Sequence, residues 1–274
     1  MPTAASPAIP ASRAASLARW NRFLAVAHFA QFVLMVAISR TTAVFEPVVP
    51  TIKPIIVNGK FTGVEPTQVV LMSVPLAYVI ATFFLMSSIA HVAAGWTMRG
   101  RYEAWLARGM NPLRWVEYAF SSTVMIVAIA YISYITQFTA LIAIAGCNAA
   151  MNLFGWSMES ANEGRLAKGE RVDWKHFIFG CIAGLAPWIA IFSIVLAFSA
   201  QEGLPAGAQI PAFVYVIIGT LFVSFNIFAI TMVLQYRQVG RWRDYLTGEK
   251  TYMLLSLIAK TLLAWQVWSG TLRP

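Results

Sequence analysis

Seven stretches of this chain are longer and more apolar than the helices of ordinary soluble domains. They cover roughly residues 21–42, 67–98, 112–136, 139–162, 175–200, 208–238 and 248–271. About 20 apolar residues in a helix are enough to cross the hydrocarbon core of a bilayer. Charged residues make up 11% of the chain, whereas soluble domains carry about 25%. The sequence therefore predicts an all-α membrane protein built as a seven-transmembrane-helix bundle.

The first 20 residues have a different composition from the rest of the chain. They are rich in Ala, Ser and Pro, carry Arg13 and Arg19, and lack the apolar centre of a secretory signal peptide. Such a composition is typical of a disordered segment. We expect a disordered cytoplasmic tail over 1–20, followed by a single membrane domain over 21–274.

Basic residues are distributed unequally between the two sides of the predicted bundle. The chain has a formal net charge of +9 from 20 Lys and Arg against 11 Asp and Glu. Fifteen basic residues fall on the side that holds the N-terminus, and four (Arg40, Lys53, Lys60 and Arg273) fall on the other. The more basic side of a membrane protein faces the cytoplasm. We predict a cell-membrane protein with a cytoplasmic N-terminus, an extracellular C-terminus and no role in binding nucleic acid.

The longest predicted extracellular connection, 42–66, contains a hairpin signal. Two β-rich runs flank Asn58-Gly59 in the segment IIVNGKFTGV, and Asn-Gly is a favoured pair for a tight β-turn. This pattern predicts a small extracellular β-hairpin between the first two spanning helices. Such a hairpin serves either as a contact in a dimer or as a simple cap.

Lys260 lies near the middle of the last apolar stretch, 252–268. A charge at that depth costs about 2.5–3.5 kcal/mol on insertion scales, so it needs a compensating group. Ser256 is four residues earlier and lies on the same helical face. A free lysine would need a partner acid, whereas a lysine condensed with an aldehyde would need a pocket and a counter-ion.

Glu117 is the acid that the predicted spans place deepest in the bilayer. Arg114, three residues earlier, lies on the same face and could form a local pair with it. A second possible arrangement is that Glu117 faces Lys260 on the last predicted helix. Helical side chains lean toward the N-terminus of their own helix, so the Lys260 side chain should lean toward the level of Glu117. Depth therefore favours the second arrangement.

Further polar residues lie in the cytoplasmic half of the first two predicted spans. His28 and Gln31 are three apart in the first, and Ser87 and His91 are four apart in the second. One buried histidine is more often a structural core group than a functional one. Two histidines at matching depth on adjacent helices make a shared site an equally good interpretation.

Several segments of the chain together resemble heliorhodopsins, a family of microbial retinal proteins with inverted membrane topology. They are NPLRWVEYAFSS around Glu117, SSIAHVAAG around His91, GLAPW around Pro187 and SLIAK ending at Lys260. The cytoplasmic N-terminus also agrees with that family. The resemblance covers essentially the whole chain after the tail.

The resemblance implies a cofactor and a set of site residues. All-trans retinal would be bound covalently to Lys260, with Glu117 as its counter-ion. A proton-accepting polar cluster and a pocket wall would surround them. The implied cluster contains His28, Gln31, Ser87, His91 and Ser256, and the implied wall contains Phe225, with Trp188 and Ser121 or Ser122 as further candidates. The resemblance also implies a homodimer.

These observations predict a light-sensing photoreceptor with a signalling or regulatory output and no enzymatic activity. Its expected partners are membrane lipids, a second copy of the chain and a cytoplasmic signalling protein that contacts the inner loops.

Two alternative functions compete with this prediction. A light-driven or light-gated proton transporter would need exchangeable groups on both sides of Lys260, but the predicted outer half offers only neutral residues such as Tyr131, Tyr134 and Asn148. A bundle without retinal, either a transporter or an enzyme with a Lys–Glu site, has no metal-ligand spacing or hydrolase motif to support it.

Overall fold

The computed structural model describes residues 9–203 and 209–273. Within these residues the chain forms eight α-helices. They are α1 (Ala11–Ile38), α2 (Leu76–Val92), α3 (Arg99–Ala107), α4 (Pro112–Ile132), α5 (Phe138–Ala161), α6 (Lys175–Ser199), α7 (Ala212–Tyr236) and α8 (Tyr245–Val267). Short π-helical turns, Ala93–Thr97 and Trp268–Leu272, extend α2 and α8, and a 3₁₀ helix, Gly240–Arg243, precedes α8.

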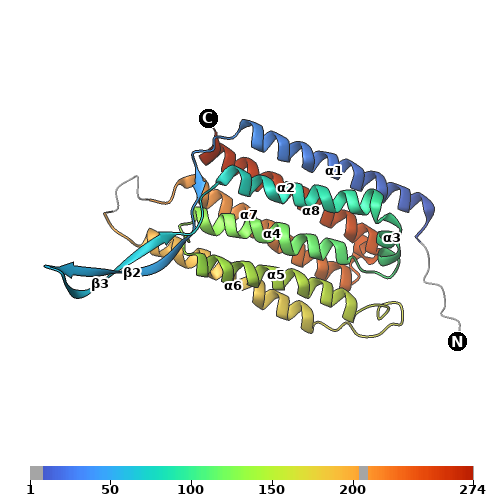
Figure 1. Ribbon diagram of the computed structural model, residues 1–274. Coiled ribbons are helices and arrows are strands. Elements are labelled where there is room, and N and C mark those ends of the chain that lie inside the picture. Colours follow the sequence, from blue (N-terminus) through green and yellow to red (C-terminus); the bar gives the residue numbers. More distant parts are fainter. Residues whose placement is uncertain (1–8, 204–208, 274) are drawn as a thin grey trace.

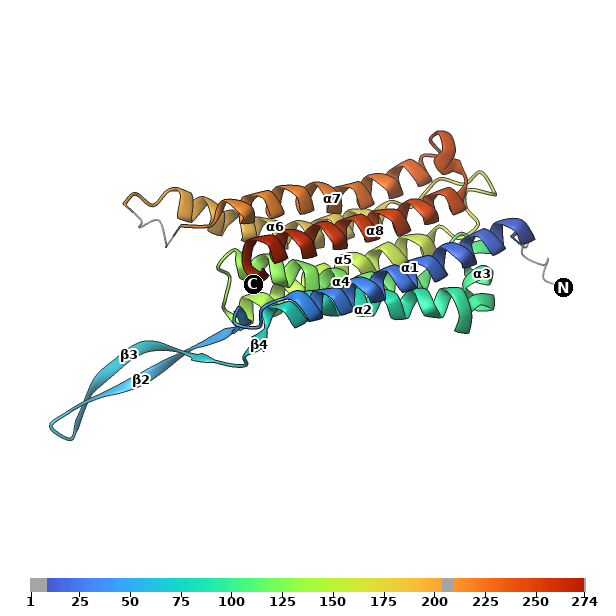
Figure 2. The same ribbon diagram turned by 90° about the horizontal axis from the view of Figure 1, so that it is seen from above.

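The seven long helices lie side by side along one axis (Figures 1 and 2). Neighbours in the sequence pack together as α1 with α2, α4 with α5, α5 with α6, and α7 with α8. Helix α2 also packs on α4, and α8 contacts both α1 and α2. Figure 1 shows a β-hairpin at one end of the bundle and the short helix α3 at the other. We call these ends the hairpin end and the α3 end.

Six helices in the described part of the chain are long and apolar enough to cross a membrane: α1, α2 with its π turn, α4, α5, α6 and α7. The prediction of a helical membrane protein is therefore confirmed. Helix α8 is not among the six, because it begins with the polar segment YLTGEK and carries Lys260.

The predicted hairpin is present and is longer than the sequence suggested. Strand β2 (Val48–Val57) pairs antiparallel with β3 (Lys60–Val70) across a turn at Asn58 and Gly59. Both turn residues have positive φ, 49° and 76°, as a type I′ turn requires. A second, two-residue pair joins β1 (Val44–Phe45) to β4 (Val74–Pro75) at the base of the hairpin.

Two predicted boundaries are wrong. Residues 11–20 belong to α1 and are not a disordered tail, because Leu17 is buried in a small apolar cluster with Tyr102 and Leu106 of α3. Residues 1–8 of the expected tail lie outside the described residues. Helix α2 begins at Leu76, about nine residues later than expected, because residues 60–70 form strand β3.

Apolar and polar residues are segregated along the bundle axis. The hairpin end holds the largest apolar cluster, which includes Met35, Phe83, Phe84, Ile129 and Leu263. Among the described residues, the charged residues that are buried as whole residues are Arg114, Glu159, Glu249 and Lys260. The first three lie on the α3 side of Lys260, at helix ends that approach α3. Lys260 therefore lies where an apolar half of the bundle meets a polar half.

Glycines on α5 provide a test of this packing. A Cβ atom added at Gly155 would lie 2.3 Å from the Trp115 ring, whereas one added at Gly146 would have no atom within 4 Å. Overpacking of this kind costs about 1–3 kcal/mol. We expect Gly155→Ala to lower the thermal midpoint of the purified protein and the matched control Gly146→Ala to leave it unchanged or raise it slightly. Equal midpoints for the two variants would contradict the packing of α5 against α4.

Candidate functional site

Lys260 is buried in the middle of the bundle and has two oxygen partners. Its side chain is 3% exposed. The Nζ atom donates a hydrogen bond to Ser256 Oγ at 2.7 Å and lies 3.2 Å from Glu117 Oε1. The serine is one helical turn earlier on α8, and the glutamate comes from α4. A buried ion pair of this kind offsets much of the cost of removing the lysine charge from water.

A serine of α2 holds the Glu117 carboxylate in place. Ser87 Oγ donates a hydrogen bond to Glu117 Oε1 at 2.6 Å. Ser121 is buried one turn further along α4, on the same face as Glu117. The Lys260 ammonium also lies 5.3 Å from the centroid of the Tyr118 ring. The structure therefore brings Lys260, Ser256, Glu117 and Ser87 into one connected group.

The two predicted histidines stack on each other beside this group. The rings of His28 and His91 are 5.5 Å apart between centroids and nearly parallel, at 5°. His91 Nδ1 donates to Asn21 Oδ1 at 2.8 Å. His28 is fully buried, and its ring nitrogens form no hydrogen bond with any described residue. His28 thus has an unpaired ring nitrogen among the described residues.

Gln31 does not join the histidine pair. Its Oε1 atom accepts hydrogen bonds from Thr261 Oγ1 at 3.0 Å and from Trp265 Nε1 at 3.3 Å. Both partners follow Lys260 on α8, toward the hairpin end. In the structure Gln31 therefore ties α1 to α8 and contacts neither histidine through a hydrogen bond.

A buried cluster of three charges at the α3 end was missed by the sequence analysis. Arg114 forms ion pairs with Glu159 of α5 and Glu249 of α8, and the three side chains are 4%, 1% and 2% exposed. Trp115 Nε1 donates to Glu159 at 2.7 Å, and Tyr102 donates to Glu249 at 3.0 Å. Arg114 is therefore not paired with Glu117, which leaves Glu117 to Lys260.

Sequence reasoning missed this cluster because Glu159 and Glu249 fall at predicted helix ends, where acids are usually solvated. The available signal was depth: the two acids and Arg114 lie at the same level on three different helices. A small cavity of about 40 Å³ lies between the cluster and Glu117. Its lining includes His91, Glu117, Tyr102, Arg114 and Glu249.

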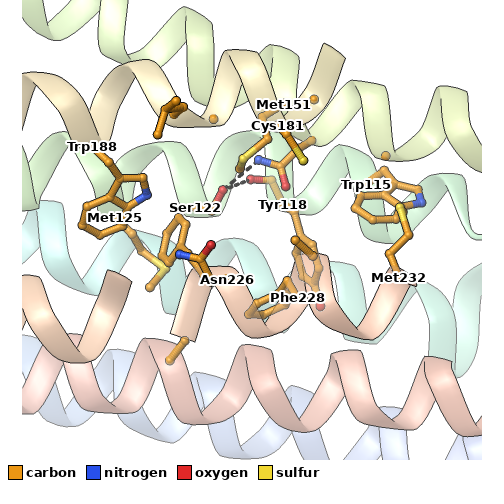
Figure 3. A pocket seen from close by; sticks show the side chains of 18 of the residues that line it. Trp115, Tyr118, Ser122, Met125, Met151, Cys181, Trp188, Asn226, Phe228 and Met232 are labelled. Atoms are coloured by element: carbon orange, nitrogen blue, oxygen red, sulfur yellow. Dashed lines mark hydrogen bonds between the residues drawn. The ribbon is translucent and has the colours of Figure 1, made fainter. Parts of the chain in front are cut away.

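A much larger cavity of about 350 Å³ extends from Lys260 between α4, α5, α6 and α7 (Figure 3). This volume falls within the range of small-molecule sites, roughly 300–1,000 Å³. Two predicted wall residues, Trp188 and Phe225, line it with their rings 5.7 Å apart and edge to face. Ser122 also lines it, whereas Ser121 does not.

Few kinds of side chain line this large cavity. Aromatic and sulfur-containing side chains dominate it, including Trp115, Met125, Met151, Phe222, Phe228 and Met232. Of the described residues that line the cavity, Lys260 carries a charge and His176 is able to carry one. The cavity therefore suits an apolar molecule, and Lys260 gives it a primary amine in the wall.

Comparison with known protein families gives one match. A family model described as heliorhodopsin matches residues 17–272. A search of curated proteins found no match. The family match covers all eight helices except the first turns of α1.

The buried charge cluster generates a prediction about stability. Replacing Arg114 with Met leaves two buried carboxylates without a counter-charge, a change that costs about 3–5 kcal/mol. Arg108 makes an exposed ion pair with Glu163, and such pairs contribute about 0–1 kcal/mol. We expect Arg114→Met to reduce the yield of folded protein sharply and to lower its thermal midpoint, and Arg108→Met to leave both nearly unchanged. A stable Arg114→Met protein would show that the cluster contributes little to stability.

Proposed function

The chain belongs to the heliorhodopsin family of retinal-binding, light-responsive membrane proteins, and from this premise we propose that it is a light-sensing receptor whose all-trans retinal is joined to Lys260 as a protonated Schiff base. The observation that carries the proposal is the position of Lys260. Lys260 lines the apolar cavity of about 350 Å³, and its Nζ atom lies 3.2 Å from the Glu117 carboxylate.

The protein residues supply the electrostatics of this site. Retinal, when bound, absorbs the light and isomerises. Glu117 neutralises the positive charge at Lys260 Nζ, because an opposite charge within about 4–6 Å favours the charged form. Ser87 and Ser256 orient the two partners through hydrogen bonds of 2.6 and 2.7 Å. Glu117 and the stacked His28–His91 pair are the acceptors for a proton released from Nζ.

The proposed topology has seven spans, with α8 as the seventh and the N-terminus in the cytoplasm. Helix α8 has 23 residues, which exceeds the roughly 20 needed to cross a bilayer. Two buried charged residues of α8 form ion pairs: Lys260 with Glu117, and Glu249 with Arg114. The excess of basic residues at the α3 end supports a cytoplasmic position for that end. The hairpin would then be extracellular.

The distribution of polar groups supports a receptor over a proton transporter. Among the described residues, each buried acid or histidine lies level with Lys260 or on its α3 side. The hairpin side is filled by the apolar cluster that contains Phe83, Phe84 and Ile129. A proton leaving Lys260 therefore has acceptors in one direction and an apolar barrier in the other. We propose that the proton moves within the α3 half and returns.

Two protein contacts follow from this arrangement as proposals. The surface at the α3 end, with α3 and the segment 162–174, would meet a cytoplasmic signalling partner. The hairpin exposes apolar side chains, among them Ile52, Ile56 and Phe61, and would contact a second copy of the chain in a homodimer.

The covalent link is tested with absorption spectra after incubation with all-trans retinal. We expect Lys260→Ala to form no visible pigment, because the amine that joins the cofactor is absent. Lys250→Ala is the matched control, since Lys250 lies on the same helix and its side chain is at the surface. A Lys260→Ala protein with the wild-type spectrum would contradict the link.

The counter-ion is tested with Glu117→Gln, which keeps the shape of the side chain and removes its charge. We expect the absorption maximum to shift, because the charge that stabilises the protonated Schiff base is absent. Glu103→Gln is the control, because Glu103 makes only a local pair with Arg99 on α3. An unchanged maximum in Glu117→Gln would assign the counter-ion elsewhere.

Transport is tested by illuminating cells or lipid vesicles that contain the retinal-bound protein. We expect a photocycle in flash spectroscopy without a pH change across the membrane, because the apolar cluster at the hairpin end blocks the path. A light-induced pH change that a protonophore abolishes would show that the protein transports protons.

A further inference from the structure

We propose that Asn226 makes the large cavity selective for a retinal whose ring carries an oxygen substituent, either a hydroxyl or a keto group. This inference rests on the proposed function, since it concerns the far end of a molecule attached to Lys260. It adds a specificity-determining residue and the chemical class of the ligand that this residue recognises.

The position of Asn226 on α7 places it toward α6. Phe222 is one turn earlier on the same face, and its ring packs against Trp188 and Phe192 of α6 at 5.2 and 5.3 Å between centroids. Phe228, on a different face of α7, packs against Tyr118 of α4. Asn226 therefore lies on the side of α7 toward α6, where it lines the cavity with an exposed side chain.

The far end of the ligand must lie in this same region. Lys260 is on α8, and α8 packs against α7, α1 and α2. The lining of the cavity includes Lys260 and, on α6, Cys181, Gly184 and Leu185. A straight molecule held at Nζ therefore extends away from α8 and ends between α5, α6 and α7. Its ring would lie within the part of the cavity that Asn226 lines.

The amide of Asn226 has unused hydrogen-bonding capacity. Its Nδ2 atom donates to the backbone oxygen of Phe222 at 2.8 Å, and it forms no hydrogen bond with any other described side chain. Figure 3 shows the amide turned into the cavity. The side chain is exposed rather than buried, so its free amide atoms are accessible to a ligand, and an amide without a partner at membrane depth is unfavourable.

Asn152, Ser256 and His176, which also line the cavity, have side-chain partners. Asn152 donates to Ser122 at 3.0 Å, Ser256 accepts from Lys260, and His176 is 2.8 Å from Ser157. Asn226 differs from them in having only its own helix backbone as a partner. A ring hydroxyl could donate to its Oδ1 atom, and a ring keto oxygen could accept from its second N–H. The geometry therefore matches an oxygenated ring better than a hydrocarbon ring.

The experiment is a competition on the full-length protein expressed without retinal. The protein is incubated with equal concentrations of all-trans retinal and all-trans 3-hydroxyretinal, and in a second series with all-trans 4-oxoretinal as the competitor. Bound chromophores are released with hydroxylamine and quantified by chromatography. The variant is Asn226→Leu. The control is Ser224→Ala, which removes a polar group on the same helix that bonds to its own backbone and does not line the cavity.

We expect the wild-type protein to incorporate the oxygenated retinal in excess by about two- to twelvefold, the range for one net hydrogen bond. Asn226→Leu should bring the ratio to about one while still forming pigment with retinal, and Ser224→Ala should keep the wild-type ratio. Equal incorporation by the wild-type protein, or an unchanged ratio in Asn226→Leu, would overturn the inference. Absence of pigment with every retinal would instead overturn the proposed function, so the two failures are distinguishable.

Discussion

The ion pair between Lys260 and Glu117 determines how the rest of the bundle is built. Two opposite charges with almost no solvent contact are stable only if each also has hydrogen-bond partners and fixed geometry. Ser256 and Ser87 provide these partners, from α8 and α2. The pair therefore requires three helices, α2, α4 and α8, to meet at one level. This requirement explains why α8 lies against α1 and α2 as well as α7.

A second group of buried charges, formed by Arg114, Glu159 and Glu249, lies apart from the Lys260–Glu117 pair and leaves Glu117 to Lys260. Arg114 is held by Glu159 and Glu249 and stacks on the ring of Tyr252 at 4.1 Å. Because these acids occupy the guanidinium, it does not compete with Lys260 for Glu117, although Arg114 and Glu117 are one turn apart on α4. The polar half of the bundle thus contains two separate charge groups, with a small cavity between them.

Much of this arrangement could be predicted from the sequence. The apolar stretches, the Asn58-Gly59 turn and the depth of Lys260 predicted the spans, the hairpin and the proximity of Glu117. The length of the hairpin, the helical residues 11–20 and the burial of Glu159 and Glu249 could not be predicted, because each depends on contacts between distant segments. The helical start of α1, for example, is stabilised by the packing of Leu17 on α3, which local composition does not reveal.

The segregation of polar and apolar residues links the fold to the proposed function. At the hairpin end, Arg40 N–H bonds to the oxygen of Leu272, and Tyr131 binds the backbone of Val44 and Glu46. These bonds use backbone groups of the loops, so they close that end without buried titratable side chains. At the α3 end, Asn21 and Tyr102 connect His91 to Glu249 through hydrogen bonds of 2.8, 3.4 and 3.0 Å. Because Tyr102 lies on α3 and bonds to Glu249 of α8, this chain of hydrogen bonds connects the histidine pair beside Lys260 to the buried charge cluster at the α3 end.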